Sequence, residues 1–91
     1  MQFGGQRFRV ELSRKARNYY ERLDADTAAR LDEAFEAMEE NPWSGDIRPV
    51  KGKPGTWRRR EGDLRIIYRV DKQTRVVTVT LILPRGDVYK H

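Results

Sequence analysis

The chain has 91 residues, of which 37% are hydrophobic and 36% charged, with no cysteine and a single histidine, His91. A chain of this length is expected to form one small domain over residues 1–91. The absence of cysteine excludes a disulfide framework, a thiolate zinc site and a cysteine nucleophile, and one histidine at the last position excludes sites that need an internal histidine base.

The positive charge is concentrated in the second half of the chain. The net charge is +5, but residues 1–46 carry seven Lys or Arg against ten Asp or Glu, and residues 47–91 carry twelve against four. No apolar run is long enough to cross a membrane and no signal-peptide pattern opens the sequence, so we expect a cytoplasmic protein without a membrane partner. For such a protein the charge asymmetry favours an anionic partner, with nucleic acid the leading candidate.

The first half of the chain predicts a strand followed by two helices. Residues 1–6 are expected to be a flexible lead-in, and apolar residues alternate with charged ones over residues 7–12, the period of a half-buried strand. Ser13 is a suitable N-cap for a first helix, and a second helix is predicted to start near Asp24 or Asp26 and to end at Asn41-Pro42. The short connection implies an antiparallel helix pair.

The second half predicts an irregular loop and then a β-meander. Three prolines and three glycines lie in residues 42–55, which we expect to cross the molecule without regular structure. Strands are predicted over residues 56–61, 64–71 and 74–83, with Gly62-Asp63 and Lys72-Gln73 as two-residue turns. The predicted fold class is therefore α+β: an N-terminal strand, an antiparallel helix pair and an antiparallel three-strand meander, forming one sheet that the helices cover on one face.

The two turns fix a register, and the register sorts the side chains onto two faces. It places Arg60 opposite Arg65, and Tyr68 opposite Val77. The face toward the helices would then be apolar (Leu64, Ile66, Tyr68, Val70, Val77, Val79, Leu81 and Leu83). The other face would collect Arg58, Arg60, Arg65, Arg69, Thr78 and Thr80. Like charges directly opposite each other destabilise a sheet by up to about 1 kcal/mol per pair, and guanidinium groups on rigid strands suit bidentate binding of phosphate. We therefore predict an anion site on this face.

Two segments and their order along the chain carry a family resemblance. Residues 57–68 read WRRREGDLRIIY and residues 84–89 read PRGDVY. With the order strand–helix–helix–meander and the Asn41-Pro42 helix end, they resemble the RelE/ParE superfamily, the toxins of type II toxin–antitoxin systems. The resemblance covers residues 7–90. The pattern aromatic-Arg-x-Arg-x-Gly-Asp-x-Arg-x-x-Tyr is specific for the superfamily but less so for activity, because the superfamily contains both messenger-RNA endonucleases and gyrase inhibitors.

The resemblance implies a metal-independent endoribonuclease of the RelE branch, without a cofactor. In that branch the 2′-hydroxyl of messenger RNA in the ribosomal A site attacks the adjacent phosphate. The family's catalytic positions match Arg58, Arg60, Arg65, Arg85 and Tyr89 of this sequence, and the Arg85…Tyr89 pair favours this branch. The alternatives are a ParE-type inhibitor of DNA gyrase, which is not an enzyme, and a degenerate homologue that binds only antitoxin or RNA.

The resemblance also implies partners. They are a cognate antitoxin that would lie across the arginine-rich face or displace the C-terminal segment, messenger RNA on the ribosome, ribosomal RNA, and operator DNA through the antitoxin alone. Lys51, Lys53 and Arg69 would contact RNA backbone, which gives affinity without sequence choice.

Position 58 departs from the best-studied family pattern, which has a lysine there as the supposed general base. Arginine stays protonated and is a poor proton acceptor. Either Arg58 lowers the pKa of the 2′-hydroxyl electrostatically, or Glu61, Tyr89 or His91 accepts the proton. Arg59 and Glu61 also depart from the apolar residues usual in the family, and we expect them to lie at an exposed edge or to pair with each other.

Overall fold

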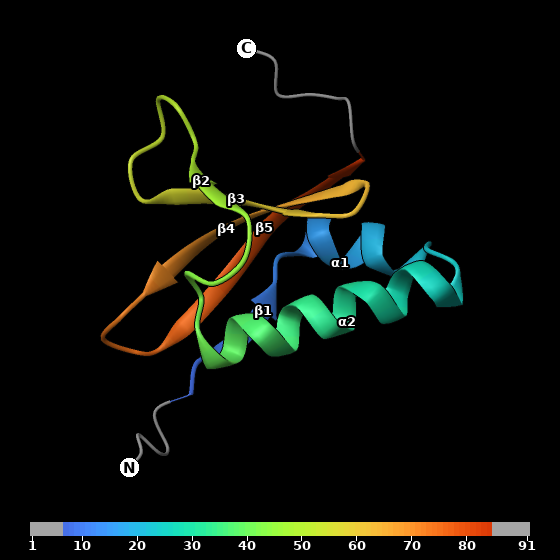
Figure 1. The fold of residues 1–91 in the computed structure, drawn as a ribbon, viewed down its shortest axis with the longest axis horizontal. Helices are drawn as coiled ribbons and strands as arrows, with labels where there is room; N and C mark the ends of the chain where they lie inside the picture. The colour runs from blue at the N-terminus through green and yellow to red at the C-terminus, as the bar shows by residue number, and fades with distance from the viewer. Residues whose placement is uncertain (1–6, 85–91) are drawn as a thin grey trace.

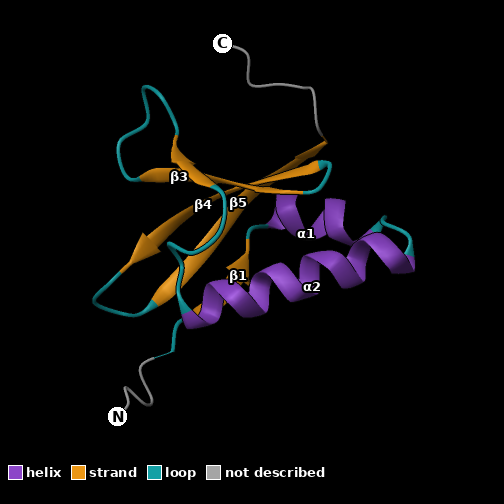
Figure 2. Cartoon of the chain, in the orientation of Figure 1, coloured by secondary structure: helices purple, strands orange, loops and turns teal. Residues whose placement is uncertain are grey.

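The computed structural model describes residues 7–84, in which a five-stranded sheet carries two helices on one face (Figures 1 and 2). The strand order is β1-β5-β4-β3-β2, and only β1 and β5 pair in parallel. This is the α+β class predicted from the sequence. No helix in residues 7–84 has both the length and the apolar character needed to span a membrane.

Strand β1 (Arg9–Leu12) leads into α1 (Arg14–Glu21) and α2 (Ala25–Glu40), and both predicted N-caps are confirmed. The Ser13 hydroxyl accepts a hydrogen bond from the Ala16 N–H at 3.1 Å, and an Asp24 carboxylate oxygen accepts one from the Thr27 N–H at 3.2 Å. Each bond satisfies a backbone donor that the first turn of a helix leaves without an internal partner. Helix α2 ends before Asn41 and runs back along α1 in the opposite direction (Figure 1).

The first hairpin has the predicted register. Strands β3 (Thr56–Glu61) and β4 (Leu64–Asp71) place Arg60 opposite Arg65 and turn at Gly62-Asp63. Gly62 has φ +58°, a left-handed backbone conformation that residues with a Cβ rarely adopt, so the turn requires glycine.

Strand β2 (Ile47–Pro49) was not expected, because it lies inside the segment predicted to be irregular. It spans three residues at the edge of the sheet, where it places Arg48 opposite Arg58. Proline is tolerated on an edge strand because it lacks only an N–H that a further strand would need. A short, proline-containing strand has too little alternation to be visible in the sequence.

The predicted register between β4 and β5 (Val76–Pro84) is wrong. Tyr68 lies opposite Val79 and not Val77, because the connection spans residues 72–75 instead of two residues. An Asp71 carboxylate oxygen accepts hydrogen bonds from the N–H groups of Gln73 and Thr74, at 2.9 and 3.1 Å, and Arg75 has φ +59°. Residues 74 and 75, which were predicted to begin the strand, therefore belong to this aspartate-capped turn.

A β-bulge changes the faces of β5 beyond Val79. Tyr68 pairs with Val79 but Ile67 pairs with Leu81, so Thr80 is an extra residue on β5. The prediction that Leu81 and Leu83 face the helices is therefore wrong, and Ile82 takes their place in the core at 3% exposure. Leu81 and Leu83 lie on the opposite face, beside Ile67 and Arg65.

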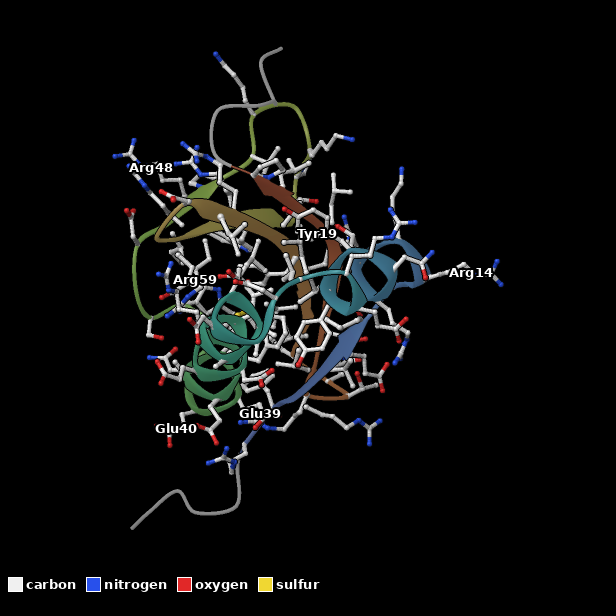
Figure 3. The ribbon with its side chains drawn as sticks, turned by 90° about the vertical axis from the view of Figure 1, so that its right-hand side faces the viewer. Arg14, Tyr19, Glu39, Glu40, Arg48 and Arg59 are labelled. Atoms are coloured by element: carbon white, nitrogen blue, oxygen red, sulfur yellow. The ribbon has the colours of Figure 1, made fainter. Side chains whose placement is uncertain are left out.

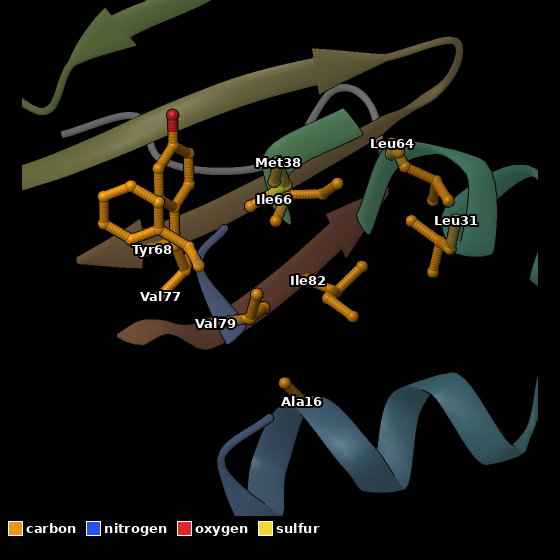
Figure 4. Packing of buried hydrophobic residues seen from close by; sticks show 11 residues of the cluster. Ala16, Leu31, Met38, Leu64, Ile66, Tyr68, Val77, Val79 and Ile82 are labelled. Atoms are coloured by element: carbon orange, nitrogen blue, oxygen red, sulfur yellow. The ribbon is translucent and has the colours of Figure 1, made fainter. Parts of the chain in front are cut away.

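The core lies between the helices and the sheet (Figure 4). Its buried members come from both helices, from β4 and β5, and from the residue before β1: Phe8, Ala16, Leu31, Ala34, Met38, Leu64, Ile66, Tyr68, Val77, Val79 and Ile82. The Tyr68 hydroxyl donates a hydrogen bond of 2.6 Å to the Pro42 carbonyl. Burial raises the pKa of Tyr68 to about 12, and this bond ties the end of α2 to the middle of the sheet.

Candidate functional site

Five arginines lie on the sheet face that the helices leave open, and we call this surface the cationic face (Arg48, Arg58, Arg60, Arg65 and Arg69). Alternate residues of a strand point to the same side, so Arg58 and Arg60 share one face of β3. The register brings Arg65 and Arg69 of β4 to the same face, with Arg60 directly opposite Arg65. The predicted grouping of these four side chains is therefore confirmed.

Arg48 is the member that sequence reasoning missed. It lies on β2 opposite Arg58 and is exposed. In Figure 3 it projects from the outer edge of the molecule, whereas Arg59 lies nearer to α2. Because β2 was not predicted, no register connected Arg48 with β3.

The cationic face has no internal counter-charge. In residues 7–84 the ion pairs join Arg7, Arg9 and Arg59 to glutamates, and none includes an arginine of the cationic face. Nε of Arg58 and Nη1 of Arg65 are shielded from solvent and have no hydrogen-bond partner among residues 7–84. Unpaired buried donors are costly and rare in proteins. Arg58 and Arg65 therefore lack the full set of partners that a structural arginine such as Arg59 has, and an anion would reach these two nitrogens after a movement of the side chains.

Arg59 stands between two members of the cationic face in sequence but points to the opposite side of the sheet. It is only 8% exposed. Its Nε donates to a Glu61 carboxylate oxygen at 3.2 Å, and its Nη1 donates to the Ser44 carbonyl at 2.9 Å. The expected pairing of Arg59 with Glu61 is therefore confirmed, and Arg59 is buried instead of lying at an exposed edge. The Glu61 carboxylate faces away from Arg58 and Arg60.

A hollow of about 540 Å³ adjoins the cationic face. Its polar lining includes Lys15 from the first turn of α1, Lys53 from the loop before β3, and Arg69 from β4, and no carboxylate of residues 7–84 lines it. Arg69 is held in place because its Nη1 donates a hydrogen bond to the Thr56 hydroxyl at 3.0 Å. Lys15 was missed, because its position on an exposed helix turn gives no sequence signal that it reaches the sheet.

The other predicted site residues lie on a loop or outside the described part of the chain. Lys51 is exposed in the loop between β2 and β3, and Lys53 follows it on the same loop. Arg85, Tyr89 and His91 lie outside the described residues. The described part of β5 ends at Pro84, which pairs with Leu64 next to Arg65.

A family model described as the ParE toxin of the type II toxin–antitoxin system parDE matches residues 10–89. A comparison with curated protein sequences finds no match.

Solved toxin structures have the same fold at low sequence identity. The RelE–RelB complex of Pyrococcus horikoshii OT3 gives a TM-score of 0.76 at 24% identity, covering 89% of this chain and 98% of that one. The RelBE2 toxin–antitoxin complex of Mycobacterium tuberculosis gives 0.77 at 22%, covering 87% and 99%. The isolated RelE toxin of E. coli gives 0.73 at 15%, covering 90% and 88%.

Proposed function

The chain belongs to the RelE/ParE superfamily as a toxin of a type II toxin–antitoxin system, and from this premise we propose that it is a metal-independent endoribonuclease that cleaves messenger RNA in the ribosomal A site. The observation that carries the proposal is the cationic face: Arg58, Arg60 and Arg65 lie on paired strands with no carboxylate partner in residues 7–84. Arg59, which supports the fold, has a carboxylate partner. Arg58, Arg60 and Arg65 of the cationic face have no such partner in the described part of the chain, so their charge is available to a phosphate.

The proposed reaction needs positive charge more than it needs an acid or a base of the protein. The ribose 2′-oxygen attacks the adjacent phosphorus and the bond to the 5′-oxygen breaks, which leaves a 2′,3′-cyclic phosphate and a 5′-hydroxyl end. The pentavalent transition state carries more negative charge than the substrate. Donors that are already fixed in place therefore stabilise the transition state more than the ground state.

Arg60 and Arg65 are the proposed clamp on the phosphate oxygens, because the register holds them directly opposite each other. Arg58 is assigned to the attacking oxygen, where its charge would lower the pKa of the 2′-hydroxyl. Arg85 would stabilise or protonate the leaving 5′-oxygen. The ring of Tyr89 would stack on a base and keep the nucleotide aligned for in-line attack.

The proton acceptor for the 2′-hydroxyl is assigned outside β3. Arg58 stays protonated at ordinary pH, and the Glu61 carboxylate is bonded to Arg59 on the other side of the sheet. The proposal therefore gives this role to Tyr89 or His91, of which His91 alone has an ordinary pKa near neutrality. Lys51, Lys53 and Arg69 would hold the RNA backbone beside the reacting phosphate.

The proposed partner in the absence of RNA is the cognate antitoxin. The P. horikoshii and M. tuberculosis relatives are complexes of toxin with antitoxin. An antitoxin segment across the cationic face would block access of RNA and neutralise its charge. The antitoxin's own DNA-binding domain would bring the complex to operator DNA.

A second candidate is a non-enzymatic inhibitor of DNA gyrase, and it is favoured by one observation: the matching family model is that of the ParE toxin. A third is a degenerate homologue that binds antitoxin or RNA and acts on neither target.

One experiment separates the three. Purified ribosomes with a defined messenger RNA in the A site are incubated with the wild-type toxin, with Arg65→Ala, and with Arg14→Ala as the matched loss of one arginine. We expect cuts within A-site codons from the wild type and from Arg14→Ala, and none from Arg65→Ala. Intact messenger RNA with trapped gyrase–DNA complexes would establish the second candidate. If messenger RNA stays intact, no gyrase–DNA complex is trapped and expression causes no growth arrest, the degenerate homologue is the remaining candidate.

A further inference from the structure

We propose that the hollow beside the cationic face is a nucleotide-binding pocket, which holds one nucleotide of the RNA strand next to the scissile phosphate and in which Lys15 of α1 binds phosphate. The inference rests on the proposed RNA cleavage, because it assumes that the strand crosses the same sheet face. It adds to that function a residue from a helix and a surface that contacts a base or ribose.

The bulge at Thr80 turns Leu81 into the floor of the pocket, which is apolar. Without an extra residue, Leu81 would continue the inward alternation of Val77 and Val79. With it, Leu81 turns outward and lies opposite Ile67, which is 3% exposed, and both line the hollow together with Pro54. Bulges are common beside functional sites, where they re-aim a side chain.

Ser13 fixes α1 to this bulge and so brings Lys15 to the rim. The Ser13 N–H donates to the Val79 carbonyl at 2.9 Å, and its hydroxyl donates to the Thr80 carbonyl at 2.9 Å. The same hydroxyl caps the first turn of α1. Because Lys15 lies in that turn, its position relative to the sheet is set by three hydrogen bonds of one serine.

The chemistry of the lining matches a nucleotide. Lys15, Lys53 and Arg69 supply positive charge at the rim, the described lining contains no carboxylate, and the floor is apolar. The volume of about 540 Å³ lies within the range of small-molecule sites, about 300–1,000 Å³. A phosphate at the rim and a base or ribose on the floor would use both parts, as single-stranded nucleic acids do when they bind through backbone charge and base contacts.

The pocket also lies where the strand would continue. Arg65 of the proposed phosphate clamp and Arg69 of the pocket are four residues apart on β4, which corresponds to about 13 Å along the strand. Ile67 lies between them on the same face. An RNA strand bound to Arg65 therefore reaches the pocket with an adjacent nucleotide.

The first test measures the charge contribution of Lys15. The probe is a short single-stranded RNA with methylated 2′-hydroxyls, which cannot be cut, and its affinity for the free toxin is measured by fluorescence anisotropy at several salt concentrations. Lys15→Gln should weaken binding about fivefold and make the plot of log affinity against log salt about 0.7 less steep, as expected for one lost phosphate contact on a single strand. Arg14→Gln removes the same charge from the neighbouring residue, which projects away from the sheet (Figure 3), and should change neither value.

The second test measures the contribution of the apolar floor. Leu81→Ala should weaken binding of the normal probe about fivefold, because about 1 kcal/mol of apolar contact is lost. It should leave unchanged the binding of a probe whose bases are removed from the nucleotides beside the central phosphate. A melting curve of the variant shows whether it is folded. An equal loss with both probes would overturn a contact between Leu81 and a base.

The results separate this inference from the proposed cleavage. If the ribosome assay shows no cuts but Lys15→Gln still weakens RNA binding more than Arg14→Gln does, the pocket stands and the nuclease function fails. If the wild type cuts messenger RNA, and Lys15→Gln and Leu81→Ala cut and bind RNA as well as the wild type does, the function stands and the pocket is overturned. Equal RNA binding together with weaker antitoxin binding by Lys15→Gln would also overturn it, and would assign the hollow to the protein partner.

Discussion

Arg58, Arg59 and Arg60 are consecutive in the sequence but belong to two different environments. Arg59 points toward the helices, is 8% exposed and has a carboxylate and a carbonyl as partners. Arg58 and Arg60 point to the open face and have no ion pair with a described residue. The chemical type of the side chain is the same in all three, so the alternation of the strand decides which one supports the fold and which ones remain available for a ligand.

The environment of Arg59 is built around its guanidinium. Gly45 has φ +83°, and a Cβ at this position would lie 2.8 Å from the Cζ atom of Arg59. The loop before β2 therefore closes directly over the arginine. On the open face, Arg60 faces Arg65 across the hairpin, an arrangement that lowers stability by some tenths of a kcal/mol up to about 1 kcal/mol. Stability is gained on one face and given up on the other.

The largest effect is expected from Arg65→Gln. Ribosome-dependent cleavage should fall about 100- to 1,000-fold, because a fixed cation at the developing negative charge is lost. The melting temperature should stay the same or rise slightly, since a repulsive pair is relieved. Cleavage rates and thermal denaturation of the same preparation provide both values. A fall in melting temperature that accounts for the lost activity would contradict the contrast between the two faces.

Arg59→Met should act in the opposite way. The free energy of unfolding should fall by about 3 kcal/mol, because Glu61 and the Ser44 carbonyl lose a buried partner. Urea denaturation measures the change. Any fall in cleavage should follow the fraction of folded protein. Arg58→Met is the matched control on the other side of the strand and should leave the unfolding free energy unchanged or raise it, because it removes an unpaired buried donor and deprives no other group of a partner.

Tyr68→Phe tests the helix-covered face a second time. Loss of the hydroxyl leaves the buried Pro42 carbonyl without its donor and should lower stability by about 2 kcal/mol. The pKa of Tyr68 is raised to about 12 in the folded chain, above its ordinary value of about 10. Its contribution to stability is therefore complete below about pH 10 and is lost as the pH rises toward about 12. Between about pH 10 and about pH 12 the free energy of unfolding should fall more steeply with pH for the wild type than for Tyr68→Phe. The same dependence on pH in both proteins would disprove the assignment.

Gly45→Ala should lower the unfolding free energy by about 1 to 2 kcal/mol, since alanine is strained at φ +83° and its Cβ meets the Arg59 guanidinium. Combining it with Arg59→Met removes the steric part of this loss. A double-mutant cycle should therefore give a non-additive term of about 0.5 kcal/mol or more. Strict additivity would mean that the loop does not close over Arg59.

The smallest effect is expected from Arg58→Lys. If Arg58 acts by its charge alone, cleavage should stay within about tenfold of the wild type, and the dependence of the rate on pH should keep its shape between about pH 6 and about pH 9. A faster reaction with a new pH-dependent step would instead show that a side chain at position 58 accepts the proton.

The elements governed by local rules were predictable. Ser13 and Asp24 are caps whose side chains bond to nearby backbone, and Gly62-Asp63 is a turn that few other residue pairs allow. Together they define the helix starts and the register of β3 with β4. The grouping of Arg58, Arg60 and Arg65 on one face followed directly from that register.

The elements that depend on tertiary structure were not predictable. The turn after Asp71 takes two more residues than predicted, and the bulge at Thr80 adds one residue to β5. Neither change alters the apolar pattern of the sequence, so that pattern fits the wrong register of β4 with β5 as well as the right one. Lys15 reaches the sheet only because Ser13 bonds to the bulge. A correct alternation therefore located the arginines but not the hollow beside them.

The parallel pairing of β1 with β5 has a consequence for synthesis of the toxin. Arg9 pairs with Val76, so the first strand finds its neighbour only after the residues from Val76 onward in β5 have been translated. The hairpin of β3 and β4 is local and can form early, but the layer that supports it from behind cannot close until then. A nascent chain should therefore reach its native topology only after β5 has been translated, and a product truncated before Val76 should stay an unassembled polypeptide.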